Sequence, residues 1–216
     1  MFRNSWVVLI LLSYFFSHSA VAENIVLGRF SAASLENWQG KSFKGKTDYQ
    51  LVNLNQKYVL KADSNDSASG LFYEQQIDLQ KKPVLHWRWR VENRLPVTNE
   101  QEKSGDDYAA RVYVIVSGGL AFWQTRAINY VWASRSAKGK IWPNAYAGEH
   151  AMMLALRSAD DQLGTWYEEK RNVFDDMKTL LAENVRYIDA IAIMTDTDNS
   201  HGKVTAYYGD IYFSSE

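Results

Sequence analysis

The chain has 216 residues, of which 46% are hydrophobic and 23% charged, and this composition fits one globular domain. With 24 Lys and Arg residues against 25 Asp and Glu residues, the net charge of -1 provides no positive field that would attract nucleic acid. The sequence contains no cysteine, which excludes disulfide bonds, a thiol nucleophile and iron–sulfur clusters.

Residues 1–22 have the pattern of a secretory signal peptide. Arg3 supplies a positive start, residues 6–16 form an apolar core, and Ala20 and Ala22 provide a small-residue cleavage pattern. The apolar core is about half of the roughly 20 residues that a membrane span needs, and no later segment is long enough. We therefore predict an exported protein, periplasmic or secreted, with a single domain over 23–216 and no membrane span after cleavage.

Alternation of apolar and polar residues dominates the rest of the chain and predicts strands that are buried on one face. In segment 85–91, Leu85, Trp87, Trp89 and Val91 alternate with polar residues, and a second alternating run covers 107–116. The polar loop 93–106 separates these two runs, so we expect them to be antiparallel neighbours in one sheet. Further strands are predicted at 25–30, 48–54, 58–62, 70–79, 127–133, 151–157, 188–195 and 204–213.

About ten strands with few helices indicate an all-β fold, a two-sheet antiparallel β-sandwich. One helix is predicted around 173–183, because Val173, Met177, Leu180 and Leu181 form an apolar stripe. Asp176 falls on the opposite side of this helix, which is expected to face solvent.

Six segments resemble the bacterial exported family called domain of unknown function 3047. They are LHWRWRV at 85–91, KSGDDYAARVYV at 103–114, NYVW at 129–132, Trp166 with RNVFDD at 171–176, MTDTDN at 194–199 and AYYGDIYF at 206–213. The resemblance implies a β-sandwich of the jelly-roll or galactose-binding-like kind in exported proteins. It implies no activity and assigns no site residue.

A polar face is the strongest candidate site. If the strands at 85–91 and 107–116 are neighbours, side chains of one parity project to the same side of the sheet. They are His86, Arg88 and Arg90 from the first strand and Asp107, Arg111 and Tyr113 from the second. Arginines in this setting suit recognition of a carboxylate or sulfate. The alternative is a solvated face on which the arginines pair with Glu92, Asp106 and Asp107.

Three loop aromatics, Trp123, Trp142 and Tyr146, either stack on a sugar ring or cap an open end of the sandwich. Together with the polar face they favour a non-catalytic protein that binds a carbohydrate or another small polar ligand, with an anionic glycan as one option. Two alternatives stay open. One is a polysaccharide lyase that uses His86, Arg111 and Tyr113, and the other is a module that docks a cell-envelope protein.

Two oxygen-rich segments are candidates for calcium: Asp196, Asp198 and Asn199 in one, and residues 63–67 in the other. Neither follows the EF-hand pattern, and turns stabilised by Asp and Asn side chains explain both segments more simply. His86, His150 and His201 are too widely spaced for a zinc site. We therefore expect no cofactor, and the oligomeric state stays open.

Overall fold

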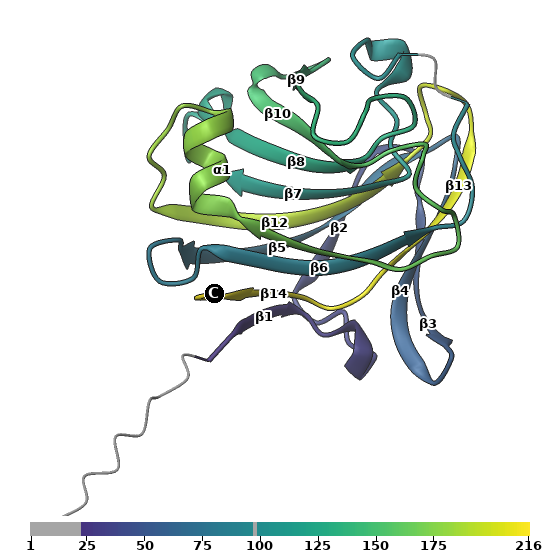
Figure 1. Cartoon of the computed structure of the whole chain (residues 1–216), viewed down its shortest axis with the longest axis horizontal. Coiled ribbons are helices and arrows are strands. Elements are labelled where there is room, and N and C mark those ends of the chain that lie inside the picture. Colours follow the sequence, from purple (N-terminus) through teal and green to yellow (C-terminus); the bar gives the residue numbers. More distant parts are fainter. Residues whose placement is uncertain (1–22, 97–98) are drawn as a thin grey trace, which may run out of the picture.

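Two sheets of seven strands pack face to face in a computed structural model that describes residues 23–96 and 99–216 (Figure 1). The order of the first sheet, sheet A, is β1-β14-β6-β13-β4-β3, with β11 also paired to β6. The order of the second, sheet B, is β2-β5-β12-β7-β8-β10-β9. The predicted two-sheet β-sandwich is confirmed, whereas the predicted signal peptide, residues 1–22, lies outside the described residues.

The elements have the following bounds. Sheet A contains β1 (Ile25–Gly28), β3 (Asp48–Leu54), β4 (Lys57–Asn65), β6 (Val84–Val91), β11 (Tyr167–Asn172), β13 (Lys203–Tyr208) and β14 (Ile211–Ser214). Sheet B contains β2 (Trp38–Lys44), β5 (Ala68–Asp78), β7 (Ala110–Val116), β8 (Arg126–Trp132), β9 (Ile141–Asn144), β10 (Gly148–Arg157) and β12 (Tyr187–Asp196). The helix α1 (Val173–Leu180) lies beside β6, β8 and β11.

The core between the sheets is built by the inward residues of each alternating strand. Trp87 and Trp89 of β6 and Val112 and Val114 of β7 are all buried in it. Trp89 packs edge-on against Trp132 of the opposite sheet, with 6.1 Å between ring centroids. Large aromatic side chains therefore supply much of the apolar surface that holds the sheets together.

The predicted pairing of the strands at 85–91 and 107–116 is wrong, because β6 lies in sheet A and β7 in sheet B. The connection between them crosses from one sheet to the other, and Leu95 within it is buried in the core. Two strands that face each other across a core have the same alternation as two that pair edge to edge. Periodicity alone does not separate these arrangements.

Other boundaries also differ from the predictions. The segment 204–213 forms two strands, β13 and β14, and the strand predicted at 25–30 ends at Gly28. The strands β2, β9 and β11 were not predicted, and β8 and β10 are parallel rather than antiparallel. In α1, Val173 and Met177 are buried as expected. Asp176 is also buried, contrary to the prediction, because it accepts hydrogen bonds from Tyr130 and Arg171.

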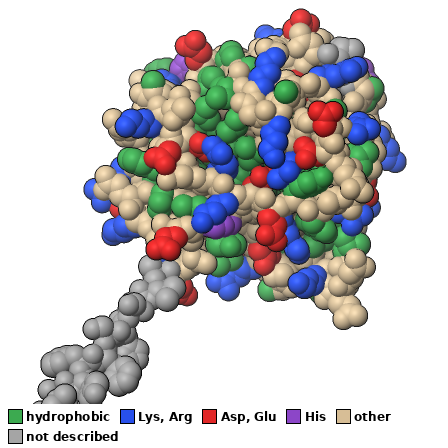
Figure 2. All heavy atoms as spheres, viewed as in Figure 1, with side chains coloured by type: hydrophobic (Ala, Val, Ile, Leu, Met, Phe, Trp, Pro, Cys, Tyr) green, Lys and Arg blue, Asp and Glu red, His purple; other side chains and the backbone are tan. Residues whose placement is uncertain are grey.

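Charged side chains of both signs are interspersed on the face of the molecule shown in Figure 2, without a large region of one sign. In the described part of the chain, no helix is both long and apolar enough to cross a membrane.

Candidate functional site

A groove runs over the outer face of sheet B, on the side away from the core. The outward residues of the three central strands form its floor: Arg111 and Tyr113 on β7, Asn129 on β8, and Met194 and Asp196 on β12. These positions face outward because their neighbours Val112, Ile128 and Ile193 point into the core. The alternation of each strand thus produces a core face and a groove face at once.

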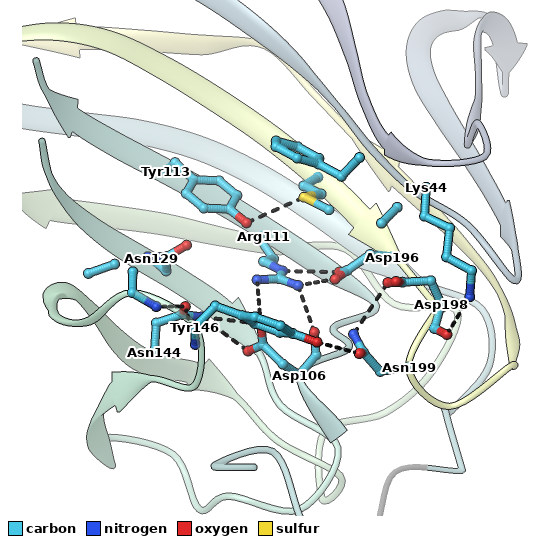
Figure 3. Close-up of a pocket in the computed structure, with 15 residues that line it drawn as sticks. Lys44, Asp106, Arg111, Tyr113, Asn129, Asn144, Tyr146, Asp196, Asp198 and Asn199 are labelled. Carbon is cyan, nitrogen blue, oxygen red and sulfur yellow. Dashed lines mark hydrogen bonds and ion pairs between the residues drawn. The ribbon is translucent and has the colours of Figure 1, made fainter. Parts of the chain in front are cut away.

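The groove has two halves with different linings. The polar half, about 470 Å³ in volume, includes Asp106, Arg111, Asn129 and Asp198 (Figure 3). The apolar half, about 540 Å³, includes Phe72, Ile115 and Trp123. Phe43, Tyr113, Ala147, Ala151 and Met194 line both halves. The two hollows therefore adjoin on the outer face of sheet B, and together they are called the groove.

Arg111 is the centre of a buried ion cluster in the polar half. Its Nε lies 3.0 Å from Oδ1 of Asp196, and its Nη2 donates to Oδ2 of the same carboxylate. Nη2 also donates to the backbone carbonyl of Asp106 at 2.9 Å, and Nη1 lies 3.9 Å from the Asp106 carboxylate. Because Arg111 is only 3% exposed, this guanidinium serves to compensate buried acids. It is not a free anion receptor, which corrects the expected role of Arg111.

The acids of the polar half are difficult to ionise. Burial raises the pKa of Asp196 to about 7, although the charge of Arg111 opposes this shift. Burial also raises the pKa of Asp106 and of Asp198 above their usual range. Neighbouring carboxylates add to the effect, so a further negative charge in this half is unfavourable.

A mesh of side-chain hydrogen bonds fixes the wall of the polar half. Asn144 lies at the end of β9, and its side-chain Nδ2 donates to the Asp106 carboxylate. Its side-chain Oδ1 accepts from the backbone N–H groups of Tyr146 and Ala147. The Tyr146 hydroxyl donates to Oδ1 of Asn199 at 2.7 Å. The turn after β9 is thus joined to both the loop before β7 and the loop after β12, as Figure 3 shows.

The residues of the predicted polar face are divided between the two sheets. Arg111 and Tyr113 line the groove on sheet B, whereas His86, Arg88 and Arg90 lie on the outer side of sheet A. His86 stacks on Tyr212 at 4.6 Å, the Arg88 guanidinium lies 4.6 Å from the ring centroid of Trp166, and Arg90 pairs with Glu92 at 2.5 Å. His86 and Arg88 also line a separate hollow of about 440 Å³. The single face that combined all these side chains does not exist.

Asp107 does not join this face either. It is fully buried, and its carboxylate accepts hydrogen bonds from the backbone N–H groups of Asn199 and Ser200. Its role is to hold the loop that follows β12.

The three loop aromatics have different environments. Trp123 lines the apolar half and is 63% exposed, and Tyr146 lines the polar half and is 58% exposed. Trp142 is only 3% exposed, stacks on Tyr108 in a small second core and lines neither half of the groove, so it is not available there to stack on a sugar ring.

The predicted calcium segment does gather carboxylates. Side-chain oxygens of Asp107, Asp196 and Asp198 lie within 4.8 Å of one another and could hold a cation. The oxygens of Asp196 already accept from Arg111, and those of Asp107 accept from residues 199 and 200. Asn199 donates to Asp107 and accepts from Tyr146. These internal partners account for the arrangement of the acids.

Sequence reasoning missed several groove residues, notably Phe43, Asn129, Asn144 and Met194. One of them carried a usable signal. Asn129 is a lone amide within the apolar strand 127–133, and asparagine is depleted in strands. Phe43 lies on a strand that was not predicted, and Asn144 acts through a turn whose position depends on the tertiary fold.

Comparison with known proteins places the chain in a family. The family model described as "Protein of unknown function (DUF3047)" matches residues 36–212, so the chain belongs to this family and the predicted resemblance is confirmed. No curated protein matches the sequence.

Solved structures show similarity in fold. The family 30 carbohydrate-binding module of a cellulosomal cellulase of Clostridium thermocellum has a TM-score of 0.50 at 10% identity, over 90% of this chain and 99% of that one. A thermostable cellulase derived from the Cel12A cellulase of Rhodothermus marinus has a TM-score of 0.49 at 9% identity, over 88% and 100%. A carbohydrate-binding module of the β-sandwich superfamily has a TM-score of 0.47 at 10% identity, and the match covers 88% of this chain but 61% of that chain. At 10% identity, the similarity to the family 30 module shows the fold alone.

Proposed function

For this member of the DUF3047 family, we propose a non-catalytic function: binding of a neutral carbohydrate chain in the groove on sheet B. The observation that carries the proposal is the lining of the groove, which combines exposed aromatic rings with buried amides and carboxylates. Binding sites for small ligands typically have this composition, with apolar walls and a few fixed polar groups.

The apolar half supplies surfaces for sugar rings. Trp123 is exposed along the groove, and Phe43, which is 58% exposed, lines both halves. An exposed aromatic ring offers a flat apolar surface to the C–H groups of a pyranose, and its burial by a ligand is favourable. Two such side chains along one groove suit an extended oligosaccharide better than a single compact ligand.

The charges of the polar half favour a neutral glycan over an anionic one. Asp106, Asp196 and Asp198 line this half together with two cationic side chains, Lys44 and Arg111. Arg111 is occupied by Asp106 and Asp196, and Lys44 pairs with Asp66 and donates to the carbonyl of Asp198. Both cationic side chains that line this half are therefore engaged with acids or carbonyl groups. A uronic acid or sulfate would instead meet carboxylates.

The fold of the family 30 carbohydrate-binding module adds support, because that module is similar over nearly its whole length.

The lyase alternative loses support from the position of its three residues: His86 lies on sheet A, whereas Arg111 and Tyr113 lie on sheet B. Burial also raises the pKa of Tyr113, and its hydroxyl donates to Met194, so it is poorly suited to act as a base. We also propose that the protein is exported and is either periplasmic or secreted, as the sequence of residues 1–22 predicts.

A glycan array followed by calorimetry on residues 23–216 tests the proposal. We expect binding of one class of neutral oligosaccharide, with little change in affinity between 50 mM and 500 mM salt, because no ion pair forms with the ligand. Salt-sensitive binding of uronic acid polymers would replace this proposal with an anionic glycan. Binding of an envelope protein without any glycan would favour a docking module.

A further inference from the structure

The side chain of Asn129 has both of its polar atoms buried without a hydrogen-bond partner, whereas Trp87, Arg90, Glu92, Trp142 and Ser200 each have one such atom among the described residues. Asn129 lies on β8 between its register partners Tyr113 of β7 and Met153 of β10, and it is 1% exposed. Both its Nδ2 and its Oδ1 are buried, and neither has a hydrogen-bond partner among the described residues. The side chain nevertheless lines the polar half of the groove.

The neighbours explain why the amide has no partner. The Tyr113 hydroxyl donates to Sδ of Met194, at 3.4 Å, and Nδ2 of Asn144 donates to the Asp106 carboxylate at 3.1 Å. Tyr113 and Asn144, two polar side chains of the groove, thus have partners other than Asn129 (Figure 3). A buried amide without hydrogen bonds destabilises a fold, and native proteins rarely contain one without another reason for it.

The chemistry of the amide defines the group that would satisfy it. An amide offers a donor and an acceptor side by side, and rotating it by 180° exchanges them without changing this requirement. A carboxylate only accepts and an ammonium only donates, so each would leave one atom unpartnered. Two hydroxyls on adjacent carbons of a sugar ring can donate one hydrogen bond and accept the other.

We propose that Asn129 selects the ligand of the groove by binding two adjacent free hydroxyls of one sugar ring. This inference rests on the proposed function and names its ligand class, a neutral glycan with an unsubstituted vicinal diol. Because both amide atoms are covered, the ligand reaches them when a neighbour that lines the groove, such as Tyr113 on β7, turns aside.

The test compares Asn129→Leu with the wild-type protein, using cellohexaose, xylohexaose and mannohexaose as probes in calorimetry and thermal unfolding for stability. Leucine has nearly the shape of asparagine and removes both unpartnered atoms. We expect affinity for the bound hexasaccharide to fall at least about tenfold, through loss of two hydrogen bonds. The melting temperature should stay the same or rise, because no intramolecular hydrogen bond is lost.

Asn93→Leu is the matched control. Asn93 lies outside the groove, and its amide donates to the carbonyl of Lys203 and accepts from the N–H of Thr205. This variant should bind hexasaccharides normally and melt at a lower temperature, the opposite of Asn129→Leu.

The outcomes separate the two levels of the proposal. If the wild type binds a hexasaccharide and Asn129→Leu binds it equally well, the inference is wrong and the proposed function stands. If Asn129→Leu melts several degrees lower, Asn129 has a structural role and the inference is also wrong. If the wild type binds none of these hexasaccharides and no neutral glycan on the array, or binds extended peptides instead, both fail.

Discussion

The two outer faces of the sandwich use arginine in different ways. On sheet A, Arg88 and Arg90 are partly exposed and lie over the rings of Trp166 and Tyr207. On sheet B, Arg111 is almost completely buried at the floor of a groove, between Asp106 and Asp196. The same side chain therefore contributes little to stability on one face and holds a buried network together on the other.

The largest expected effect in this comparison comes from Arg111→Ala. Removing the guanidinium leaves Asp196 buried without its cation, which typically costs about 3–5 kcal/mol. Urea unfolding of wild type and variant at pH 7.5 measures the loss. Asp196→Asn added to Arg111→Ala should recover part of it, because the remaining buried group is then neutral. A loss below about 1 kcal/mol would show that the cluster is open to water and that the two faces do not differ.

The dependence of stability on pH should identify Asp196 as well. Its pKa is about 7 in the folded protein, above its usual value of 3.8, so the folded state binds more protons between these pH values. Stability from this group is therefore present at low pH and is lost as the pH rises toward 7. Asp196→Asn should flatten the decline of the unfolding free energy between pH 5 and pH 7. An unchanged slope would mean that Asp196 is fully ionised throughout this range.

The comparison of the faces also shows what the sequence could predict. Alternation identified most strands and the two-sheet class, because one buried face per strand imposes a period of two. Alternation also placed Arg111 and Tyr113 correctly on the side opposite Val112 and Val114.

The arrangement of strands in sheets could not be predicted in the same way. The chain crosses from sheet A to sheet B between the end of β6 at Val91 and the start of β7 at Ala110, and this crossing separates His86 from Arg111 although their periodicity fits one face. The burial of Trp142 and Asp176 likewise depends on partners distant in sequence, Tyr108 and Tyr130. Such contacts arise from the tertiary fold and leave no local pattern.

An intermediate effect on binding, without a loss of stability, is expected for Trp123→Ala. Trp123 is 63% exposed on the groove face, so its removal creates no cavity in the core. Loss of an aromatic surface from a binding site should weaken affinity by about 1–2 kcal/mol, measured by calorimetry with the hexasaccharide that binds. Tyr58→Ala on β4, where the ring is 41% exposed outside the groove, is the control and should bind normally. Equal affinities of Trp123→Ala and Tyr58→Ala would show that the apolar half does not contact the ligand.

The smallest expected effect comes from Arg88→Ala on sheet A. The guanidinium lies 4.6 Å from the centroid of the Trp166 ring, and such a contact at a partly exposed site contributes about 0.5–1 kcal/mol. Urea unfolding should show a loss of this size, and calorimetry should show unchanged glycan affinity, because sheet A lies across the core from the groove. Arg88→Lys, which keeps the charge but not the planar group, should lose part of the same stability. A glycan affinity that falls in Arg88→Ala while Trp123→Ala binds normally would place the ligand in the hollow beside His86, and sheet A would then be the binding face.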